Sequence, residues 1–451
     1  MGRIFGTDGV RGIANKDLTA DFAYKLGYAA TIILAGETDH KPKILIGCDT
    51  RISCGMLETA MAAGICSAGA DVHLCGVLPT PGVAYLTKKY RYDAGVVISA
   101  SHNSFEYNGI KLFSKSGFKL PDAIEDKIEA LVLSYDEKER MNPIGNNVGQ
   151  RIFDTTAAHL YSEHLKRRQG CDLSGLRIAV DCANGAASAI APRLFQDLGA
   201  VVFSTATEPN GININDNCGS THMDNLRKLV LREGCDIGFA FDGDADRLLV
   251  TDSLGKLVDG DMIMALLGLD MKKKGLLKSD TIVATVMSNL GLSIMAKEQS
   301  LSLEKTKVGD RYVLEKMLES DFNLGGEQSG HVILLDHATT GDGILTSLAL
   351  LRAFLSAGEP LSEMVKVITI LPQVLLPAVI SESKKEEAMK DEALLAAIAK
   401  YEAQLGDSGR VLVRASGTEP MIRVMLEGKN QKEIKKMAEH LVELIVSKHG
   451  V

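Results

Sequence analysis

A cycle of short apolar runs and helix-like segments constrains the fold of this chain most strongly. In its first pass the cycle has three apolar runs, at residues 44–47, 72–77 and 94–98. Helical spacing of apolar residues alternates with these runs, at residues 22–33, 55–69 and 81–90. Runs this short are typical of strands buried on both faces, as in parallel sheets. The alternation therefore predicts an α/β fold.

The cycle returns twice, and each pass ends in a polar loop of different chemistry. The first ends in Ser99-Ala100-Ser101-His102-Asn103, the second in an acidic loop at 242–247, and the third in Gly325-Gly326-Glu327-Gln328-Ser329. Ligands of α/β sheets bind beyond the carboxyl ends of the strands. We therefore expect the three loops to meet at one site. Duplication without a shared function is the alternative.

The length of 451 residues exceeds what one hydrophobic core supports, which predicts several domains. From about Leu371 the pattern changes to a strand, a long charged helix over 383–405, two strands and a final helix over 431–448. This order favours a small α+β domain. The predicted architecture is three repeated mixed α/β domains and a smaller C-terminal α+β domain around a central cleft, at residues 1–155, 156–255, 256–369 and 370–451.

The composition is that of an ordinary soluble globular protein, with 45% hydrophobic and 24% charged residues. A net charge of −8 argues against a nucleic-acid partner, because binding to a phosphate backbone needs a basic surface. The N-terminus lacks the apolar core of a signal peptide. The most apolar helical stretch, Gly343 to Gly358, is interrupted by Arg352 and is too short to span a bilayer. We expect a cytoplasmic protein without a membrane partner.

The acidic loop Asp242-Gly243-Asp244-Ala245-Asp246-Arg247 is a candidate metal site. In an extended chain its three aspartates would point to the same side, because side chains alternate along a strand. Carboxylates about 4 Å apart repel by roughly 4 kcal/mol at an effective dielectric of 20, so such a cluster favours a bound cation. Carboxylate oxygens are ligands that Mg²⁺ prefers.

Two other structures can contain such a loop. A calcium EF-hand also begins with Asp-x-Asp-x-Asp, but it requires Gly at its sixth position and Glu at its twelfth. This chain has Arg247 and Ser253 there, which excludes the EF-hand. A solvated acidic turn remains as the alternative, although the flanking runs 238–241 and 248–251 are too apolar for a surface tail.

Ser101 directly follows a predicted buried strand and is a candidate nucleophile. Its surroundings do not match the Gly-x-Ser-x-Gly turn of α/β hydrolases, and a serine hydroxyl needs a base or a metal to become reactive. The acidic loop could supply that metal, since both loops lie at the same sheet edge. Lys111 is near enough in sequence to reach the same place. The alternative is a structural hydroxyl that caps a helix.

The loop Arg414-Ala415-Ser416-Gly417-Thr418-Glu419-Pro420 joins two strands of the predicted last domain, with Arg423 close behind. Two guanidinium groups, two hydroxyls and the backbone N–H groups near Gly417 form a candidate phosphate site. A plain β-turn with surface arginines is the alternative. The glycine-rich motifs of dinucleotide-binding and P-loop proteins do not occur in the chain.

Together these loops resemble the α-D-phosphohexomutase family over the full length of the chain. The resemblance begins with Phe5-Gly6-Thr7-Asp8-Gly9-Val10-Arg11-Gly12 and continues through the serine, acidic and glutamate loops to the Arg414 loop, in the family's order. The opening motif and the segments 308–313 and 326–331 are most similar to the branch that acts on glucosamine phosphate. Relatives that act on mannose or glucose phosphates usually carry Met at the position of Gln328 and His at that of Asp310.

The resemblance implies a role for each loop. Ser101 would be a phosphoserine, and its phosphate would bind one Mg²⁺ together with Asp242, Asp244 and Asp246. The residues that would border the transferring phosphoryl group are Arg11, Lys111 and Arg247. Those that would contact the sugar are Glu327 and Ser329, with His331 as a candidate proton carrier. The residues that would hold the other phosphate are Arg414, Ser416, Gly417, Thr418 and Arg423.

The implied activity is interconversion of glucosamine 6-phosphate and glucosamine 1-phosphate through a bisphosphate intermediate, which would feed UDP-N-acetylglucosamine and cell-wall precursor synthesis. The expected partners are small hexosamine phosphates, and a homodimer is left open. Three alternatives remain: a family member that acts on glucose or mannose phosphates, a non-catalytic sugar-phosphate sensor, and a metal-dependent phosphatase. Retention of Ser101 and the three aspartates disfavours the sensor, which needs neither.

Two residues depart from the family pattern. Ser104 stands where the family normally has proline after Ser-His-Asn, which puts the stiffness of the serine loop in question. Ala245 stands where glycine is commoner between the aspartates, a change that removes no ligand.

His102 is not expected to act as the base of Ser101, because adjacent side chains of an extended segment point apart.

Overall fold

The computed structural model describes residues 4–6, 8–36, 38–136, 142–416 and 420–450. The chain divides into two compact units. Unit 1 consists of Met1–Met287 and Leu301–Lys366, and unit 2 consists of Ser288–Ser300 and Val367–Val451. Among the described residues, unit 1 contains three sheets and unit 2 contains one.

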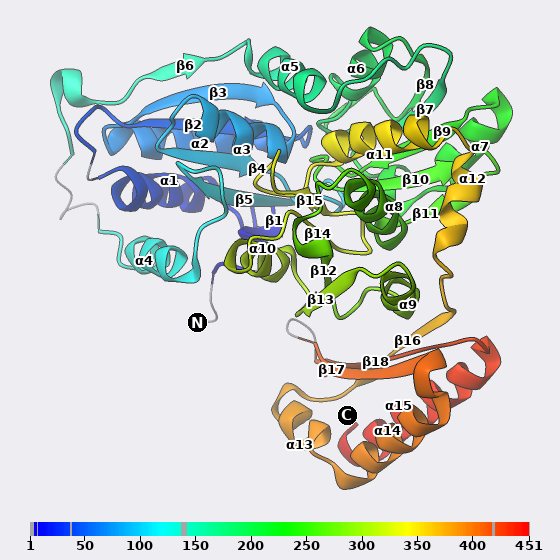
Figure 1. Ribbon diagram of the computed structural model, residues 1–451. Helices are drawn as coiled ribbons and strands as arrows, with labels where there is room; N and C mark the ends of the chain where they lie inside the picture. The colour runs from blue at the N-terminus through cyan, green and yellow to red at the C-terminus, as the bar shows by residue number, and fades with distance from the viewer. Residues whose placement is uncertain (1–3, 7, 37, 137–141, 417–419, 451) are drawn as a thin grey trace. The chain divides into compact units, whose positions relative to one another are not determined.

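The first sheet of unit 1 is built from β1 (Val10–Ile13), β2 (Lys43–Cys48), β3 (Asp71–Val77), β4 (Ala94–Ile98), β5 (Tyr107–Ser114) and β6 (Arg151–Phe153). The strand order is β1-β5-β4-β2-β3-β6, in which β5 is antiparallel to both of its neighbours and β4, β2, β3 and β6 are parallel. The helices of this part are α1 (Ala20–Ala35), α2 (Cys54–Ser67), α3 (Thr80–Lys89) and α4 (Asp122–Leu133). Helix α1 packs against α2 and α4 (Figure 1). All five residues of β4 are buried, as expected for an apolar central strand.

Two further sheets follow in unit 1. The second contains β7 (Arg177–Asp181), β8 (Val201–Thr205), β9 (Ile237–Phe241), β10 (Leu248–Asp252) and β11 (Leu257–Val258), in the order β11-β10-β9-β7-β8. The third contains β12 (Thr281–Thr285), β13 (Ser302–Thr306), β14 (Leu324–Gly326) and β15 (Val332–Leu334), in the order β13-β12-β14-β15.

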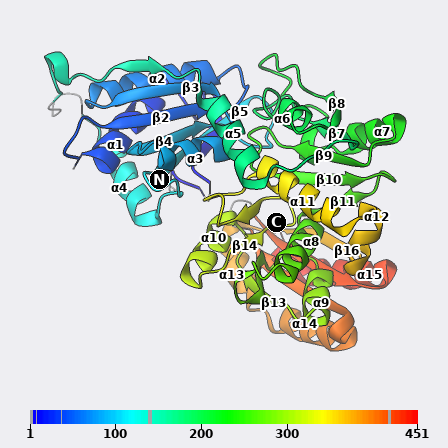
Figure 2. The same ribbon diagram turned by 45° about the horizontal axis from the view of Figure 1, so that its top comes forward.

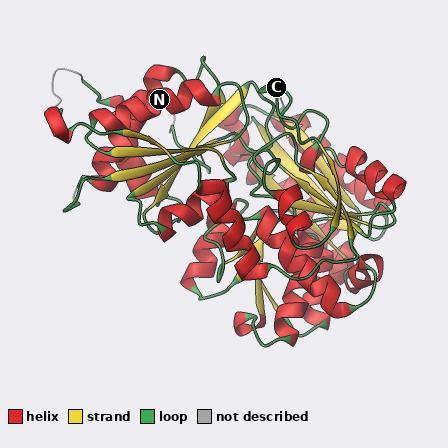
Figure 3. Cartoon of the chain, turned by 90° about the horizontal axis from the view of Figure 1, so that it is seen from above, coloured by secondary structure: helices red, strands yellow, loops and turns green. Residues whose placement is uncertain are grey.

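Seven more helices are described in unit 1. They are α5 (Ala157–Gln169), α6 (Ala191–Asp197), α7 (Asp224–Glu233), α8 (Gly260–Lys273), α10 (Asp310–Glu319), α11 (Gly343–Ala357) and α12 (Leu361–Met364). Helix α11 packs against both α5 and α8 (Figure 2). Helices flank the strands of these sheets (Figure 3). No single helix in the described part of the chain is long and apolar enough to cross a membrane.

The three sheets share one strand pattern, and this pattern positions the three polar loops. In each sheet a central strand (β4, β9 or β14) is parallel to one neighbour (β2, β7 or β12) and antiparallel to the next strand in the chain (β5, β10 or β15). Each polar loop predicted from the sequence joins that antiparallel pair. The expected fold of three repeated α/β domains is therefore confirmed.

Unit 2 has an antiparallel sheet of β16 (Gln373–Val379), β17 (Gly409–Ala415) and β18 (Met421–Gly428), in the order β16-β18-β17. Its helices are α9 (Leu290–Glu298), α13 (Lys385–Met389), α14 (Glu392–Leu405) and α15 (Gln431–His449). Helix α15 packs on β16 and β18, and α14 packs on β17 (Figure 1). Helix α9 belongs to this unit, and the N–H of Leu290 at its start donates to Oε2 of Glu427 on β18 at 3.0 Å. The expected smaller α+β part is confirmed.

The single long helix expected over 383–405 is wrong. The chain forms α13 and α14 instead, with Asp391 between them in an extended conformation. The Asp391 carboxylate accepts a hydrogen bond from the N–H of Leu394 at 3.0 Å and thereby caps the start of α14. Aspartate is far more stable at such a cap than inside a helix, so the cap overrides the helical periodicity.

Candidate active site

Ser101 lies directly beyond β4, where the chain turns. Its backbone φ of 52° is in the left-handed region, so the segment is not extended at this residue. The residue is 1% exposed, and its Oγ donates a hydrogen bond to Oδ2 of Asp242 at 2.6 Å. The structure thus brings the serine loop of the first sheet into direct contact with the acidic loop of the second.

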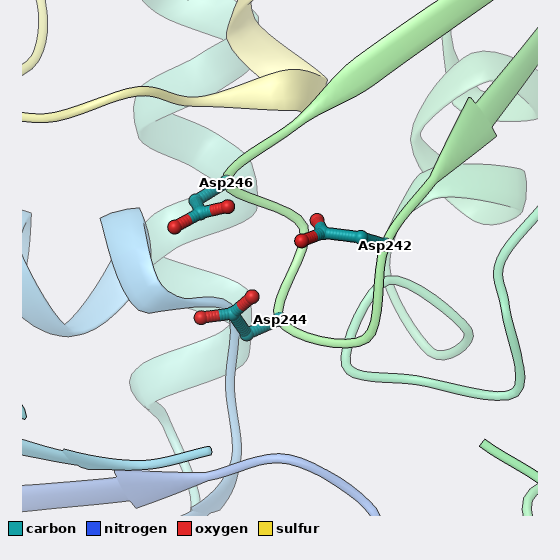
Figure 4. Close-up of side chains that lie close together, drawn as sticks. All are labelled: Asp242, Asp244 and Asp246. Carbon is teal, nitrogen blue, oxygen red and sulfur yellow. The ribbon is translucent and has the colours of Figure 1, made fainter. Parts of the chain in front are cut away.

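The three aspartates of the acidic loop converge, although the loop is not extended. Residues 242–247 form a turn between β9 and β10, and Ala245 at its centre has a φ of 57°. Turn geometry, and not strand alternation, therefore gathers the side chains. One carboxylate oxygen from each of Asp242, Asp244 and Asp246 lies within 4.8 Å of those of the other two. The three carboxyl groups face a common space in Figure 4.

The aspartate cluster is buried, and its charges oppose one another. Burial and the neighbouring Asp246 and Asp244 raise the pKa of the Asp242 carboxyl well above its ordinary value. Oδ1 of Asp244 and Oδ1 of Asp246 are buried and have no hydrogen-bond partner among the described residues. Such oxygens are costly unless a cation binds them. The cluster therefore fits a metal ion that takes oxygen ligands.

Lys111, on β5, places a fixed positive charge beside the cluster. Its Nζ lies 2.8 Å from Oδ2 of Asp244, 3.3 Å from Oδ2 of Asp246 and 2.9 Å from Oδ2 of Asp8. Burial alone would lower the pKa of this ammonium group, but Asp244 and Asp8 raise it well above its ordinary value. Lys111 is therefore charged and neutralises part of the cluster.

Asp8 holds the cations of the site together. It pairs with Nη2 of Arg11 at 2.6 Å, with Lys111, and with Lys119, which also pairs with Asp310. Burial alone would raise the pKa of the Asp8 carboxyl. The charges of Lys111, Lys119 and Arg11 nevertheless hold that pKa well below its ordinary value. The sequence predicted Arg11 and Lys111 but not Asp8 and Lys119. Asp8 was present in the opening motif, whereas Lys119 carries no local signal.

His102 is close to Ser101, contrary to the expectation from an extended chain. Its Nδ1 lies 3.4 Å from Ser101 Oγ, because Ser101 is left-handed. The same Nδ1 accepts a hydrogen bond from Nη1 of Arg247 at 3.1 Å. Burial, with Arg247 and Arg11, lowers the pKa of His102 to about 4. His102 is thus poorly suited to deprotonate Ser101, for a different reason from the one expected.

The segment after β14 places His331 against the acidic cluster. Nδ1 of His331 lies 3.6 Å from Oδ2 of Asp246, and the imidazole is 3% exposed. The backbone N–H of Gly341 donates to Nε2 at 3.0 Å. This bond leaves the proton of the neutral ring on Nδ1, toward Asp246.

Glu327 and Ser329, in the same loop, have different environments. Oε1 of Glu327 accepts a hydrogen bond from the N–H of Gly309, just before α10, at 3.1 Å. Ser329 is exposed, so its hydroxyl is open to solvent. The loop therefore offers one fixed carboxylate and one accessible hydroxyl.

Thr80 is a further residue that the sequence did not indicate. Its hydroxyl donates to Oδ2 of Asp244, and its N–H donates to the Asp244 carbonyl at 3.0 Å. Thr80 thus fixes a cluster aspartate from the first sheet's α3. Contacts between residues this far apart in the chain leave no sequence pattern.

In unit 2, Arg414 and Arg423 face each other across β17 and β18. Burial and the charge of Arg423 lower the pKa of Arg414. Like charges directly opposite on paired strands are destabilising, and an anion would relieve that repulsion. Ser416 is buried at the end of β17. Gly417 and Thr418, predicted members of this loop, lie outside the described residues.

A buried serine hydroxyl beside a buried lysine and a carboxylate cluster that fits a metal ion, at the loop ends of an α/β fold, is the arrangement of a phosphoryl-transfer enzyme. The chain belongs to the phosphoglucomutase/phosphomannomutase family, whose members are α-D-phosphohexomutases. Family models for the α/β/α domains I, II and III match residues 2–139, 159–255 and 259–370. The model for the family's C-terminal domain matches residues 378–444.

Relatives of similar length have closely similar sequences. The phosphoglucosamine mutase of Acetivibrio thermocellus is 54% identical over 450 residues, which covers 100% of both chains. The phosphoglucosamine mutase of Clostridium novyi is 52% identical over 448 residues, which covers 99% of both chains.

Solved structures share the fold at low sequence identity. A phosphoglucomutase/phosphomannomutase family protein from Burkholderia thailandensis has a TM-score of 0.81 at 23% identity, covering 99% of this chain and 97% of that one. The N-acetylphosphoglucosamine mutase of Aspergillus fumigatus, solved with GlcNAc-6P and magnesium, has a TM-score of 0.69 at 18% identity, covering 99% and 96%.

Proposed function

We propose that the protein interconverts glucosamine 6-phosphate and glucosamine 1-phosphate through a phosphorylated Ser101. The observation that carries this proposal is the contact between Ser101 Oγ and Asp242 beside Asp244 and Asp246. That contact puts a hydroxyl that can carry a phosphoryl group next to the carboxylates of the proposed metal site. The choice of glucosamine phosphate is supported by relatives that are phosphoglucosamine mutases and are 52–54% identical over their full length.

In the proposed reaction, the phosphoryl group of phosphorylated Ser101 passes to the free hydroxyl of the hexosamine monophosphate. The P–O bond to Ser101 breaks as a P–O bond to the sugar forms, and the product is a hexosamine bisphosphate. The bisphosphate then returns its other phosphoryl group to Ser101 and leaves as the isomer. In each turnover one phosphoryl group thus leaves the serine and a different one, from the sugar, takes its place.

Three cations of the site, one of them buried, are proposed to border the transferring group. Lys111, Arg11 and Arg247 supply positive charge where the phosphoryl oxygens would lie, and phosphoryl transfer depends mainly on such positioning and charge. Nε of Arg247 is buried without a partner among the described residues, so the guanidinium retains a donor for an anion. His331 is proposed to carry a proton to or from the sugar hydroxyl.

Mg²⁺ is the proposed metal, held by Asp242, Asp244, Asp246 and the phosphate on Ser101. Bound there, it would neutralise charge on the phosphoryl group. Glu327 and Ser329 are proposed to bind sugar hydroxyls. The phosphate that is not transferred is proposed to bind the loop of unit 2, at Arg414, Ser416, Gly417, Thr418 and Arg423.

The predicted domain boundaries at 155, 255 and 369 are part of the same proposal. So is a cytoplasmic location, which suits soluble sugar phosphates as substrates. The proposed partners are these small molecules, without nucleic acid or membrane.

The test is the Ser101→Ala variant assayed with glucosamine 6-phosphate. Isomerisation is expected to fall by about three orders of magnitude or more, because no group remains to carry the phosphoryl. Binding of glucosamine 6-phosphate, measured by calorimetry, is expected to persist. The intact mass of the wild-type protein is expected to include one phosphate that the variant lacks.

Ser104→Ala is the matched control, since it removes an exposed hydroxyl from the same loop. Near-normal isomerisation by Ser101→Ala would refute the phosphoserine. Release of inorganic phosphate as fast as isomerisation would instead favour a phosphatase.

A further inference from the structure

A buried arginine, Arg51, lies behind the serine loop, in the segment after β2. Its Nη2 donates to the carbonyl oxygens of Ser101 at 3.0 Å and of Asn103 at 2.8 Å. Its Nη1 donates to the carbonyl of Tyr107 at 3.1 Å and to that of Ser104. All four acceptors are backbone oxygens of residues 101–107. The guanidinium therefore fixes the backbone conformation of the loop and does not bind its side chains.

Arg51 is itself held in place by Asp49. Nε of Arg51 lies 2.9 Å from Oδ2 of Asp49, and both side chains are 0% exposed. The same Asp49 oxygen accepts a hydrogen bond from Ser99 Oγ at 2.6 Å, and Ser99 Oγ accepts one from the N–H of Ser101 at 2.9 Å. These bonds form a closed ring through Arg51, Asp49, Ser99 and Ser101. Such a ring fixes the guanidinium and the serine backbone together.

A second donor reaches the same carbonyls from the part of unit 1 that carries the acidic loop. Nδ2 of Asn215 donates to the carbonyls of Ser101 and Asn103, each at 2.9 Å. A carbonyl oxygen has two lone pairs, so it can accept from both Arg51 and Asn215. Ser101 is thus held from the first sheet and from the second at once.

The segment that carries Arg51 also binds the second part directly. The Thr50 hydroxyl donates to the carbonyl of Asn184 at 2.6 Å. The N–H of Ile52 donates to the carbonyl of Gly211 at 2.8 Å. Thr50 and Ile52, on either side of Arg51, therefore connect the segment that holds the serine loop to the region around the second sheet, which carries the acidic loop.

The serine loop needs such support. Ser101 has a φ of 52°, which a residue with a side chain adopts only where its surroundings enforce it. Ser104 also stands where proline would stiffen the loop, and its carbonyl is one of the four that Arg51 binds. Hydrogen bonds to Arg51 thus supply stiffness that the loop's own sequence lacks.

We propose that Arg51 is a positioning residue for phosphoryl transfer, which sets the place of Ser101 relative to the acidic loop without contacting the substrate. Asn215 shares this task from the opposite side. The inference rests on the proposed role of Ser101 as phosphoryl carrier.

The decisive variant is Arg51→Gln. Its kcat is expected to fall about 100-fold, because a misplacement of about 1 Å at the reacting group costs about that much. Its KM for glucosamine 6-phosphate is expected to change less than about 3-fold, because Arg51 makes no substrate contact. Arg51→Lys is expected to recover little, since one ammonium group cannot span four carbonyls.

Arg177→Gln is the matched control. The Arg177 guanidinium also donates to backbone carbonyls, those of Glu233 and Gly234, but on an exposed surface away from the serine loop. Its kcat and KM are expected to equal those of the wild type.

A second variant guards against a folding defect in Arg51→Gln, which thermal unfolding would reveal. Asn215→Gly removes the side-chain donor but keeps the positive φ of 58° that this position requires. Its kcat is expected to fall about 10-fold at unchanged KM. Single-turnover phosphorylation of Ser101 by hexosamine bisphosphate, followed by intact mass, is expected to slow in parallel in both variants. A purely structural role would lower the amount of folded enzyme and leave that rate constant unchanged.

Two results separate this inference from the proposed function. An active Ser101→Ala variant would refute the proposed function, because the reaction would then not depend on a phosphoserine. An inactive Ser101→Ala variant beside folded Arg51→Gln and Asn215→Gly variants of near-normal kcat, or with losses in KM alone, would overturn only the role of Arg51.

Discussion

Single residues at the site have conformations and charges that are unfavourable in isolation. Ser101 and Ala245 both have positive φ, at 52° and 57°, which costs a residue with a side chain about 1 kcal/mol or more. The Asp242 carboxyl has a raised pKa beside two other aspartates. Ala245 is therefore not a neutral replacement for glycine, since glycine would adopt this φ without strain.

The sequence predicted many of the residues that meet here, but not how they are held. Ser101, Lys111 and the aspartates stand in motifs, and a motif is visible in a local stretch of chain. Arg51 and Thr80 act through bonds to backbone or side chains far away in sequence. Such contacts exist only after folding, so no local pattern reports them.

The pH dependence of stability has a predictable contribution from Asp342, which caps α11. Its carboxyl accepts bonds from the N–H of Leu345 at 2.9 Å and the hydroxyl of Tyr161 at 2.8 Å, and burial raises its pKa to about 6. An unfolded aspartate ionises near pH 4. Ionisation therefore favours the unfolded chain increasingly as pH rises from about 4 to 6.

Asp342→Asn is expected to remove that cost while keeping a side chain that can cap the helix. The variant should exceed the wild type by about 1–3 kcal/mol in free energy of unfolding above pH 7, from the size of the pKa shift. The difference should vanish below pH 4. Thermal and urea unfolding followed by circular dichroism from pH 4 to 8 would measure it. A difference independent of pH would contradict the assignment.

At the scale of elements, the repeated strands were predictable, as was β10, whereas β5 was not. Strands such as β4 and β9 are continuous apolar runs, which the sequence displays directly. Strand β5 contains the buried Asn108 and Lys111, so its sequence does not resemble a core strand. The expected helix over 383–405 failed for the opposite reason, because one capping residue interrupts a continuous helical pattern.

The turn between β9 and β10 is expected to bind Mg²⁺ in the folded protein only. Added Mg²⁺ should raise the melting temperature of the wild type in proportion to the logarithm of its concentration. At 100 times the dissociation constant the gain is about 2.7 kcal/mol. Differential scanning fluorimetry would measure the rise in melting temperature. Treatment with EDTA should remove the metal, and an isomerase assay would measure the resulting loss of activity.

Asp244→Asn should abolish this stabilisation, because it removes the negative charge of one of the three carboxylates. Oδ1 of Asp244 has no hydrogen-bond partner among the described residues and is therefore available to a metal ion. Asp224→Asn, which changes an exposed aspartate at the start of α7, is the control and should respond like the wild type. An equal Mg²⁺ response in the wild type and Asp244→Asn would exclude this loop as the site.

For the whole molecule, net charge gives little information about the site. The chain carries −8 overall, yet Lys111, Lys119, Arg11 and Arg247 are gathered around the aspartates. Family membership likewise follows from the full length of the chain, whereas the branch that acts on glucosamine phosphate was predicted from a few residues. One of them is Gln328, which donates from Nε2 to Oδ2 of Asp259 at 3.2 Å.

The wild type is expected to have its highest kcat/KM with glucosamine 6-phosphate, by about 10-fold or more over glucose 6-phosphate and mannose 6-phosphate. Gln328→Met should narrow this ratio, since methionine is usual at this position in relatives that act on the other sugars. Gln404→Met, on an exposed face of α14, is the control. If the wild type instead prefers glucose 6-phosphate or mannose 6-phosphate, the protein belongs to another branch of the family.

Unit 2 is assembled from two stretches of chain, and this has a consequence for synthesis. Helix α9 emerges from the ribosome before β18, yet the Leu290 N–H at its start is bonded to Glu427 of that strand. This contact can form only after β18 has been synthesised. A chain truncated before β18 would therefore lack a bonding partner for a helix that stands much earlier in its sequence.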